Sequence, residues 1–149
     1  MGATACNKAN FNGGVNQNSN ADCRTNPGFS GHLFSWCAVA RFADTLCPYP
    51  WRVPSRQDFI DLDIALGGTG VWIQNAPHFY NYFNTWGGVL GQGWGGNLAA
   101  NSGNYWSSDQ CNADLGYSLS ITSQHNFVNP QTNRYSKRYG LSLRCVRDN

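Results

Sequence analysis

Two segments far apart in the chain decide its fold: residues 47–55 read Cys-Pro-Tyr-Pro-Trp-Arg-Val-Pro-Ser, and residues 139–148 read Tyr-Gly-Leu-Ser-Leu-Arg-Cys-Val-Arg-Asp. In the first segment the prolines end one helix and a capping residue begins another. In the second segment Leu141, Leu143 and Cys145 share one face, which is typical of a strand. If Cys47 and Cys145 are bonded, the ends of the domain are tied together, and the chain between them is free to carry long loops.

The composition indicates one loop-rich domain. The chain has 149 residues, a net charge of +2 and only 12% charged residues, so it offers no general nucleic-acid surface. Asn, Gly and aromatic residues are abundant and Glu is absent, which disfavours a helical bundle. No apolar run approaches the roughly 20 residues of a membrane helix. The first residues lack a signal-peptide pattern, so we expect a piece of a longer exported protein or export by another route.

The cysteines predict disulfides in an oxidising compartment. Their number is even and their spacing is dispersed, unlike a zinc site; they are Cys6, Cys23, Cys37, Cys47, Cys111 and Cys145. The sequence alone leaves the connectivity open. Residues 1–30 read as an irregular Asn- and Gly-rich lead-in in which Cys6 pairs with Cys23, the alternative being a flexible tail.

The pattern of elements predicts an α+β fold with two N-terminal helices and a small antiparallel sheet. One helix is expected over residues 35–47 and a second from Ser55, capped with Asp58 and ended by the glycines at 67–68. Residues 70–103 are interpreted as long loops. Alternation over residues 117–122 predicts a strand with Leu119 and Ile121 on one face, followed by a polar, turn-rich stretch.

Four ordered motifs carry a family resemblance. They are Gly-His-Leu-Phe-Ser-Trp at 31–36, the segment 47–59, Tyr-Trp-Ser-Ser at 105–108 and the segment 139–148. Together they resemble the Fibrobacter succinogenes major paralogous domain over residues 31–148. The resemblance implies a C-type-lectin-like domain over residues 31–149, secreted or on the cell surface of gut bacteria or on virions. It also implies a Cys47–Cys145 disulfide and suggests a second between Cys37 and Cys111.

The same fold occurs in the variable proteins of diversity-generating retroelements, and the C-terminal segment here is similar to theirs. The motifs of calcium-dependent lectins are missing, because the run Asn-Pro-Gln at 129–131 carries no carboxylate. We therefore expect no metal and no cofactor.

The resemblance and the polar composition together predict a binding surface for a protein or glycan, as in an adhesin. Tyrosines would give rigid contact area, and amide, hydroxyl and imidazole groups would give adaptable hydrogen bonds. The candidate ligand-binding residues are Tyr105, Asp109, Asn112, Tyr117, Ser120, His125, Asn126, Asn129, Gln131, Asn133 and Tyr135. The alternative interpretation is a set of solvated loops. We expect Tyr117→Ala to weaken binding with little change in melting temperature.

Catalysis is not expected from the sequence. No hydrolase, metalloprotease or nucleotide-binding motif is present, and His32, His78 and His125 are scattered. Two alternatives remain open, a structural or pilus-tip module and a lectin-fold oxidase that uses a reactive cysteine pair.

Overall fold

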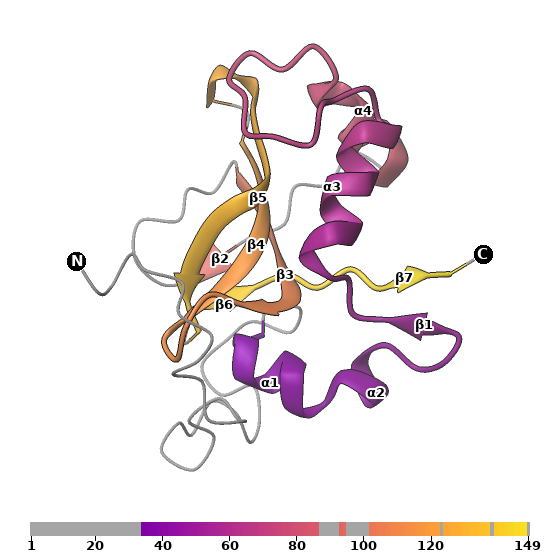
Figure 1. Ribbon diagram of the computed structural model, residues 1–149, viewed down its shortest axis with the longest axis vertical. Coiled ribbons are helices and arrows are strands. Elements are labelled where there is room, and N and C mark those ends of the chain that lie inside the picture. Colours follow the sequence, from indigo (N-terminus) through magenta and orange to yellow (C-terminus); the bar gives the residue numbers. More distant parts are fainter. Residues whose placement is uncertain (1–33, 87–92, 95–101, 123, 138, 149) are drawn as a thin grey trace.

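The computed structural model describes residues 34–86, 93–94, 102–122, 124–137 and 139–148 (Figure 1). It is an α+β domain with short helices and small antiparallel sheets, paired as β1-β7, β2-β6 and β3-β4-β5. The first elements are α1 (Trp36–Arg41), α2 (Ala43–Leu46), β1 (Trp51–Arg52), α3 (Arg56–Ala65) and α4 (Phe79–Trp86). They are followed by β2 (Gly93–Trp94), β3 (Ser102–Gln110), β4 (Leu115–Thr122), the 3₁₀ turn η4 (Gln124–Asn126), β5 (Phe127–Ser136), β6 (Gly140–Leu141) and β7 (Val146–Arg147).

The helix expected over residues 35–47 is present but divided into α1 and α2. Ser35 caps α1 by accepting a hydrogen bond from the backbone N–H of Ala38 at 3.1 Å. Phe42 interrupts the helix, because its backbone angles (φ −109°, ψ 25°) lie outside the helical range. The second piece ends at Cys47, immediately before the prolines that the sequence placed there.

The second helix, α3, begins as predicted. The Ser55 hydroxyl accepts from the Asp58 N–H at 3.1 Å, and the Asp58 carboxylate accepts from the Ser55 N–H at 2.7 Å, which completes the capping box. Phe59 is buried, and Leu62 packs against the same core. Gly67, with φ of +105°, follows the helix in the left-handed conformation that glycine adopts most easily.

The three-stranded sheet contains one element that the sequence predicted and one that it did not. Strand β4 covers the predicted segment 117–122, and Leu119 and Ile121 lie in the core as expected. Strand β5 occupies the stretch that we expected to be turn-rich. A register irregularity opposite Ser118 and Ser120 absorbs the turn residues 130–132, so the strand continues beyond them. The helix α4 was likewise not predicted, because residues 70–103 were interpreted as loops.

Two clusters of buried side chains form the core. The first fills the space between the sheet and the helices α3 and α4, and contains Phe59, Ala76, Phe79, Tyr82, Tyr105, Leu119, Ile121 and Val128. The second lies where α1 meets the middle of β3, and contains Trp36, Cys37, Val39, Trp106 and Leu141. In the second cluster the indole N–H of Trp36 donates to the Ser107 carbonyl at 2.8 Å, and that of Trp106 donates to the Phe34 carbonyl at 2.6 Å.

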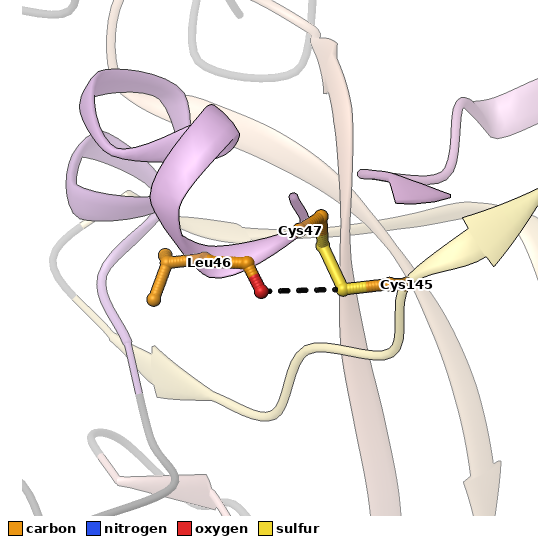
Figure 2. Close-up of a disulfide and its surroundings, with 3 residues drawn as sticks. All are labelled: Leu46, Cys47 and Cys145. Atoms are coloured by element: carbon orange, nitrogen blue, oxygen red, sulfur yellow. Dashed lines mark hydrogen bonds between the residues drawn. A yellow bond between two sulfur atoms is a disulfide. The ribbon is translucent and has the colours of Figure 1, made fainter. Parts of the chain in front are cut away.

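A disulfide and a strand pair join the segments 47–52 and 145–147. Cys47 and Cys145 are bonded, with Cα atoms 5.6 Å apart, and the Leu46 carbonyl oxygen lies 3.5 Å from the Cys145 sulfur (Figure 2). Just beyond the bond, β1 pairs with β7. The expected strand over residues 141–145 is divided into β6 and β7, because Leu141 pairs with β2 and Val146 pairs with β1.

The other predicted disulfides differ in outcome. Cys37 and Cys111 are completely buried and each is disulfide-bonded. However, Cys47–Cys145 is the one disulfide that joins two described residues, so the suggested Cys37–Cys111 bond is not formed. The expected Cys6–Cys23 pair and the lead-in 1–30 lie outside the described residues.

Arg52 reinforces the closure. Its guanidinium forms ion pairs with Asp58 at the start of α3 and with Asp148 after β7, the latter at 2.9 Å. The hydrogen bond from Arg52 holds the pKa of Asp58 below its ordinary value, and the same guanidinium lowers the pKa of Asp148. One side chain thus links the turn 47–55, the helix α3 and the C-terminal segment.

We predict that the double variant Cys47→Ala/Cys145→Ala is strongly destabilised. The bond closes a loop with a sequence separation of 98 residues, and in the chain-entropy model such a loop contributes about 4 kcal/mol. Urea unfolding of the oxidised protein measures the difference, with the exposed Gln57→Ala as a control that should stay within about 0.5 kcal/mol of wild type. A loss below about 1 kcal/mol in the double variant would contradict the assigned role of the bond.

Candidate functional site

The segment predicted to bind ligand forms the β3-β4-β5 sheet, whose two faces differ in chemistry. Along β4 the odd-numbered residues Leu119 and Ile121 point into the first core cluster, toward α3. The even-numbered residues Ser118 and Ser120 point to the opposite side. We call these two sides the core face and the polar face.

Four of the predicted contact residues are buried. Tyr105 and Tyr117 are 2% and 8% exposed, and Ser120 and Asn129 are also buried. Tyr105 belongs to the first core cluster, and the Arg56 guanidinium lies 4.1 Å from the centre of the Tyr117 ring. The expectation that these side chains present contact area to a ligand is therefore corrected. Polarity and tyrosine content favour a surface position, but the pairing of the strands, which composition does not reveal, buries these side chains.

Three further predicted residues hold the backbone in place. The Asn112 carboxamide oxygen accepts from the N–H groups of Asp114 and Leu115, at 2.8 and 2.9 Å, and so forms the turn between β3 and β4. The Asp109 carboxylate accepts from the Arg56 N–H at 2.7 Å, at the first turn of α3. The Gln131 side chain donates to the Gly70 carbonyl. Each of these polar groups is used within the fold.

Asn129 likewise organises β5. Its carboxamide oxygen accepts from the Thr132 N–H at 3.0 Å and from the Thr132 hydroxyl at 2.9 Å. These bonds close the turn 129–132 inside the strand. The turn chemistry that the sequence indicated around Asn129 is therefore present, but the turn lies within β5 and not between two strands.

The polar face carries a chain of hydrogen bonds across all three strands. The Ser120 hydroxyl donates to the Asn104 carboxamide oxygen at 2.7 Å, and the Asn133 amide donates to the Ser120 hydroxyl. Asn104 Nδ2 and Ser118 Oγ are buried and have no hydrogen-bond partner. A buried polar atom without a hydrogen-bond partner costs free energy. The stability of the fold therefore gives no reason for placing these two atoms here. Asn104 is not among the predicted site residues, because it lies just before the Tyr-Trp-Ser-Ser motif at 105–108.

The accessible predicted residues gather at the β4–β5 hairpin tip and along β5. His125 is exposed and Asn126 is half-buried, while Asn133 and Tyr135 are half-buried on the strand. His125 and Asn126 both have positive φ values, of 59° and 45°. Their carbonyl oxygens accept from the N–H groups of Asn75 and Ala76 at 2.6 and 3.0 Å. The tip is therefore tied by its backbone, while the His125 side chain projects into solvent.

The loop between α3 and α4 was not predicted to take part, yet it lies beside this tip at the upper end of Figure 1. Ile73 pairs with Val128 through two backbone hydrogen bonds of 2.9 and 3.0 Å, so the loop adds a short edge to β5. The loop carries three consecutive exposed apolar side chains, Val71, Trp72 and Ile73. A run of exposed apolar residues flanked by glycine was the signal in the sequence that could have drawn attention to it.

The side chain of Asp63, in α3, holds this loop in place. Its completely buried carboxylate accepts from the Tyr82 hydroxyl at 2.6 Å and from the Gly70 N–H at 2.8 Å, and it lies 2.6 Å from His78 Nε2. Burial is the main reason why the pKa of Tyr82 lies above its ordinary value, and the hydrogen bond to Asp63 raises this pKa further. A side chain at Gly68 would overlap with Asp63 and His78. One carboxylate thus joins α3, the loop and α4.

Lys137 is a buried cation. Its ammonium donates to the Gln110 side chain at 2.6 Å and lies 4.5 Å from the centre of the Trp36 ring. Burial lowers the pKa of Lys137 to about 8, partly opposed by the charge of Asp114. Lys137 is therefore packed against Trp36 of the second core cluster and is not a solvated surface cation.

Other kinds of site find no support in the described residues. Within residues 34–86 and the later described segments, no group of three or more His, Cys, Asp or Glu side chains could hold a metal ion. None of the helices described is long and apolar enough to span a membrane. The buried Asp63–His78 pair is enclosed, with His78 Nδ1 unpartnered and no access for a substrate at its ring.

Comparison with protein-family models, with curated proteins and with solved structures finds no match for this chain. The α+β class and the Cys47–Cys145 bond therefore stand on the structure itself.

The burial of Tyr117 reverses our expectation for its substitution. We predict that Tyr117→Ala lowers the free energy of unfolding by about 3 kcal/mol, because it removes a buried ring and the contact with Arg56. The matched control is Tyr80→Ala, which removes the same side chain from an exposed position and should cost less than about 1 kcal/mol. Equal losses for both variants, measured by urea denaturation, would show that Tyr117 is not packed as described.

We predict that Lys137 makes stability rise with pH above about pH 8. Its pKa is about 8 in the folded protein and 10.5 as an ordinary lysine, so between these values the unfolded chain binds more protons than the folded one. The charged form opposes folding below this window, and the opposition fades as pH rises through it. Lys137→Met should flatten this part of the profile of unfolding free energy against pH. An unchanged slope between pH 8 and 10.5 in the variant would disprove the assignment.

Proposed function

We propose that this chain is an exported binding domain of the C-type-lectin-like fold, which displays its C-terminal surface to a protein or glycan ligand and catalyses no reaction. The observation that carries the proposal is the arrangement of the β4–β5 tip. Its backbone is fixed by hydrogen bonds to the loop 75–76, while its His125 side chain is exposed. Such a tip allows side chains to change with little effect on the framework.

The four sequence motifs support the resemblance to the Fibrobacter succinogenes major paralogous domain, because their residues meet in the structure. The first motif bonds to the third through Trp36 and Ser107. The second bonds to the third through the Pro54 carbonyl, which accepts from the Ser108 N–H at 2.8 Å. The fourth bonds to the third through the Ser142 carbonyl, which accepts from the Trp106 N–H at 3.0 Å. Because these motif residues bond to one another and so hold the fold together, related domains are expected to keep them.

The similarity of the C-terminal segment to the variable proteins of diversity-generating retroelements extends the proposal to a variable surface. The His125 and Asn126 positions lie in left-handed backbone, which Asn, Asp and His tolerate better than most residues. These residue types are among those that adenine mutation of Asn codons yields. We propose that the exposed positions from the tip along β5 are the exchangeable ones, whereas Tyr105, Tyr117 and Asp109 are framework residues.

An exported location is part of the proposal, on the cell surface, in the medium or on a virion. Cys37, Cys47, Cys111 and Cys145 are all disulfide-bonded, which favours an oxidising compartment. The same bonds give no support to an oxidase that would need reactive thiols, since each described cysteine is already paired. A purely structural module is disfavoured by the polar face, where the Nδ2 atom of Asn104 and the Oγ atom of Ser118 have no hydrogen-bond partner, at a cost in stability.

We predict that exchange at the tip changes binding and not folding. The full chain, biotinylated, is applied to printed arrays of glycans and of surface proteins, and the variant His125→Asn/Asn126→Asp should alter affinity for its targets at least tenfold. Both new residues tolerate the left-handed conformation, so melting should shift by less than about 4 °C.

The control for that experiment is Gln57→Ala, an exposed change on α3 that should leave the binding pattern intact. Identical array patterns for wild type and the tip variant would refute a ligand contact at this tip. The variability is tested separately in the genomic DNA, where a near-copy of codons 104–146 that differs only at adenines, beside a reverse transcriptase gene, is expected. A neighbourhood without such a copy rules out diversification by this route.

A further inference from the structure

The ends of β3 and β5 carry two polar side chains that meet across the start of β4. Gln110 is the last residue of β3, and Lys137 directly follows β5. The Lys137 ammonium donates a hydrogen bond to the carboxamide oxygen of Gln110 at 2.6 Å, although 27 positions separate the two residues in the sequence. An amine thus lies in contact with a carbonyl group from another strand.

The backbone fixes both residues of this pair. Lys137 donates its N–H to the Asp114 carbonyl oxygen at 2.9 Å, and its own carbonyl oxygen accepts from the Trp36 N–H at 3.0 Å. Gln110 is paired with Gly116 of β4. A side chain at Gly116 would begin 2.6 Å from the Trp36 ring, so the indole occupies the space that a larger residue would need. The Cα atoms from which the amine and the carboxamide extend are therefore both held in place.

The surroundings of the amine favour its uncharged, nucleophilic form. Lys137 is 3% exposed, and its ammonium lies 4.5 Å from the centre of the Trp36 ring. Burial lowers the pKa of Lys137 to about 8. At pH 8 about half of the molecules therefore carry the neutral amine, whose lone pair can attack a carbonyl carbon. An ordinary lysine, with a pKa of 10.5, is almost entirely charged at this pH.

We propose that Lys137 and Gln110 form an isopeptide bond that links the end of β5 to the end of β3. The neutral Nζ of Lys137 attacks Cδ of the Gln110 carboxamide, one Nζ proton passes to Nε2, and the Cδ–Nε2 bond breaks to release ammonia. A secondary amide between Nζ and Cδ remains. The reaction exchanges one amide for another, so it needs neither an oxidant nor a cofactor.

The contact supplies what this reaction requires. Groups that are held together in good orientation react as if at effective concentrations of about 10⁵–10⁸ M. An N-terminal glutamine illustrates the chemistry, because its own amine displaces ammonia from its carboxamide without an enzyme. Positive charge develops on Nζ as the new bond forms, and the negative charge of Asp114, which acts on the Lys137 ammonium, stabilises it. The alternative is a hydrogen bond that leaves both side chains chemically unchanged.

The mass of the intact chain decides between the covalent bond and the hydrogen bond. We expect wild type, incubated at about pH 8 and then reduced and denatured, to be lighter than its sequence by about 17 Da, the mass of one ammonia. Trypsin locates the bond, because it cleaves after Arg134, and the sequence holds no Lys or Arg from 57 to 133. The peptide 57–134 should remain attached to the peptide 135–138, since trypsin does not cleave after a lysine in amide linkage.

The rate of the reaction gives a second measurement. The chain purified from inclusion bodies has not folded, so refolding starts the reaction, and mass spectrometry follows the linked fraction. The rate constant should rise with pH up to about 8 and level off above it, because it follows the neutral fraction of Lys137. The dependence of stability on pH predicted above belongs to the chain before this reaction, since the amide nitrogen of the linked form does not titrate.

Gln110→Ala and Lys137→Met each remove one reactant and should keep the full mass, whereas the control Gln57→Ala should react as wild type does. Gln110 is half-buried at the end of its strand, so Gln110→Ala should fold, which its melting temperature verifies. A wild-type chain that keeps its full mass after refolding at about pH 8 would overturn the proposal. So would a loss of ammonia that trypsin places at another residue, or one that persists in both variants. The proposal makes no use of the binding function, so its failure would leave that function standing.

Discussion

The Cys47–Cys145 bond is the constraint on which the rest of the structure depends. It fixes the end of α2 against the last segment of the chain, and the β1–β7 pair and the two ion pairs of Arg52 continue the same closure. With this end of the domain closed, α3 and the three-stranded sheet are held at a set distance, and the first core cluster fills the space between them. The upper end carries no such bond between described residues, and backbone hydrogen bonds join the α3–α4 loop to the tip of the sheet there.

The polar residues of the C-terminal part serve two different purposes that look alike in the sequence. Asn112 and Asn129 shape turns, and Asp109 bonds the first turn of α3. On the polar face, by contrast, Asn104 Nδ2 and Ser118 Oγ have no hydrogen-bond partner, and His125 is exposed to solvent. The first set contributes to folding, whereas the two buried atoms without a partner carry a cost in free energy that a function would explain.

Local signals predicted the N-terminal half well, because caps and prolines act over a few residues. The Ser55–Asp58 capping box and the end of the helix before Pro48 both depend on neighbours in the chain. The segment after Phe127 was misjudged because its strand depends on pairing with β4, while its own residues favour turns. Tyr117 was misplaced for a similar reason, since its burial depends on Arg56 from α3. The position of the exposed loop segment 71–73 beside β5 could not be predicted, because it follows from the pairing of Ile73 with Val128, which no local pattern shows.

The Asp63 carboxylate has a consequence for how the domain opens. It bonds the backbone of the loop at Gly70 and the side chains of His78 and Tyr82 from the next helix. Since these bonds share one acceptor group, the corner made by the loop and α4 is expected to detach as a cooperative unit rather than residue by residue. Proteases acting on the native protein would then cut first within residues 67–78, at a rate set by that shared release, and the disulfide-closed end would survive as the resistant remainder.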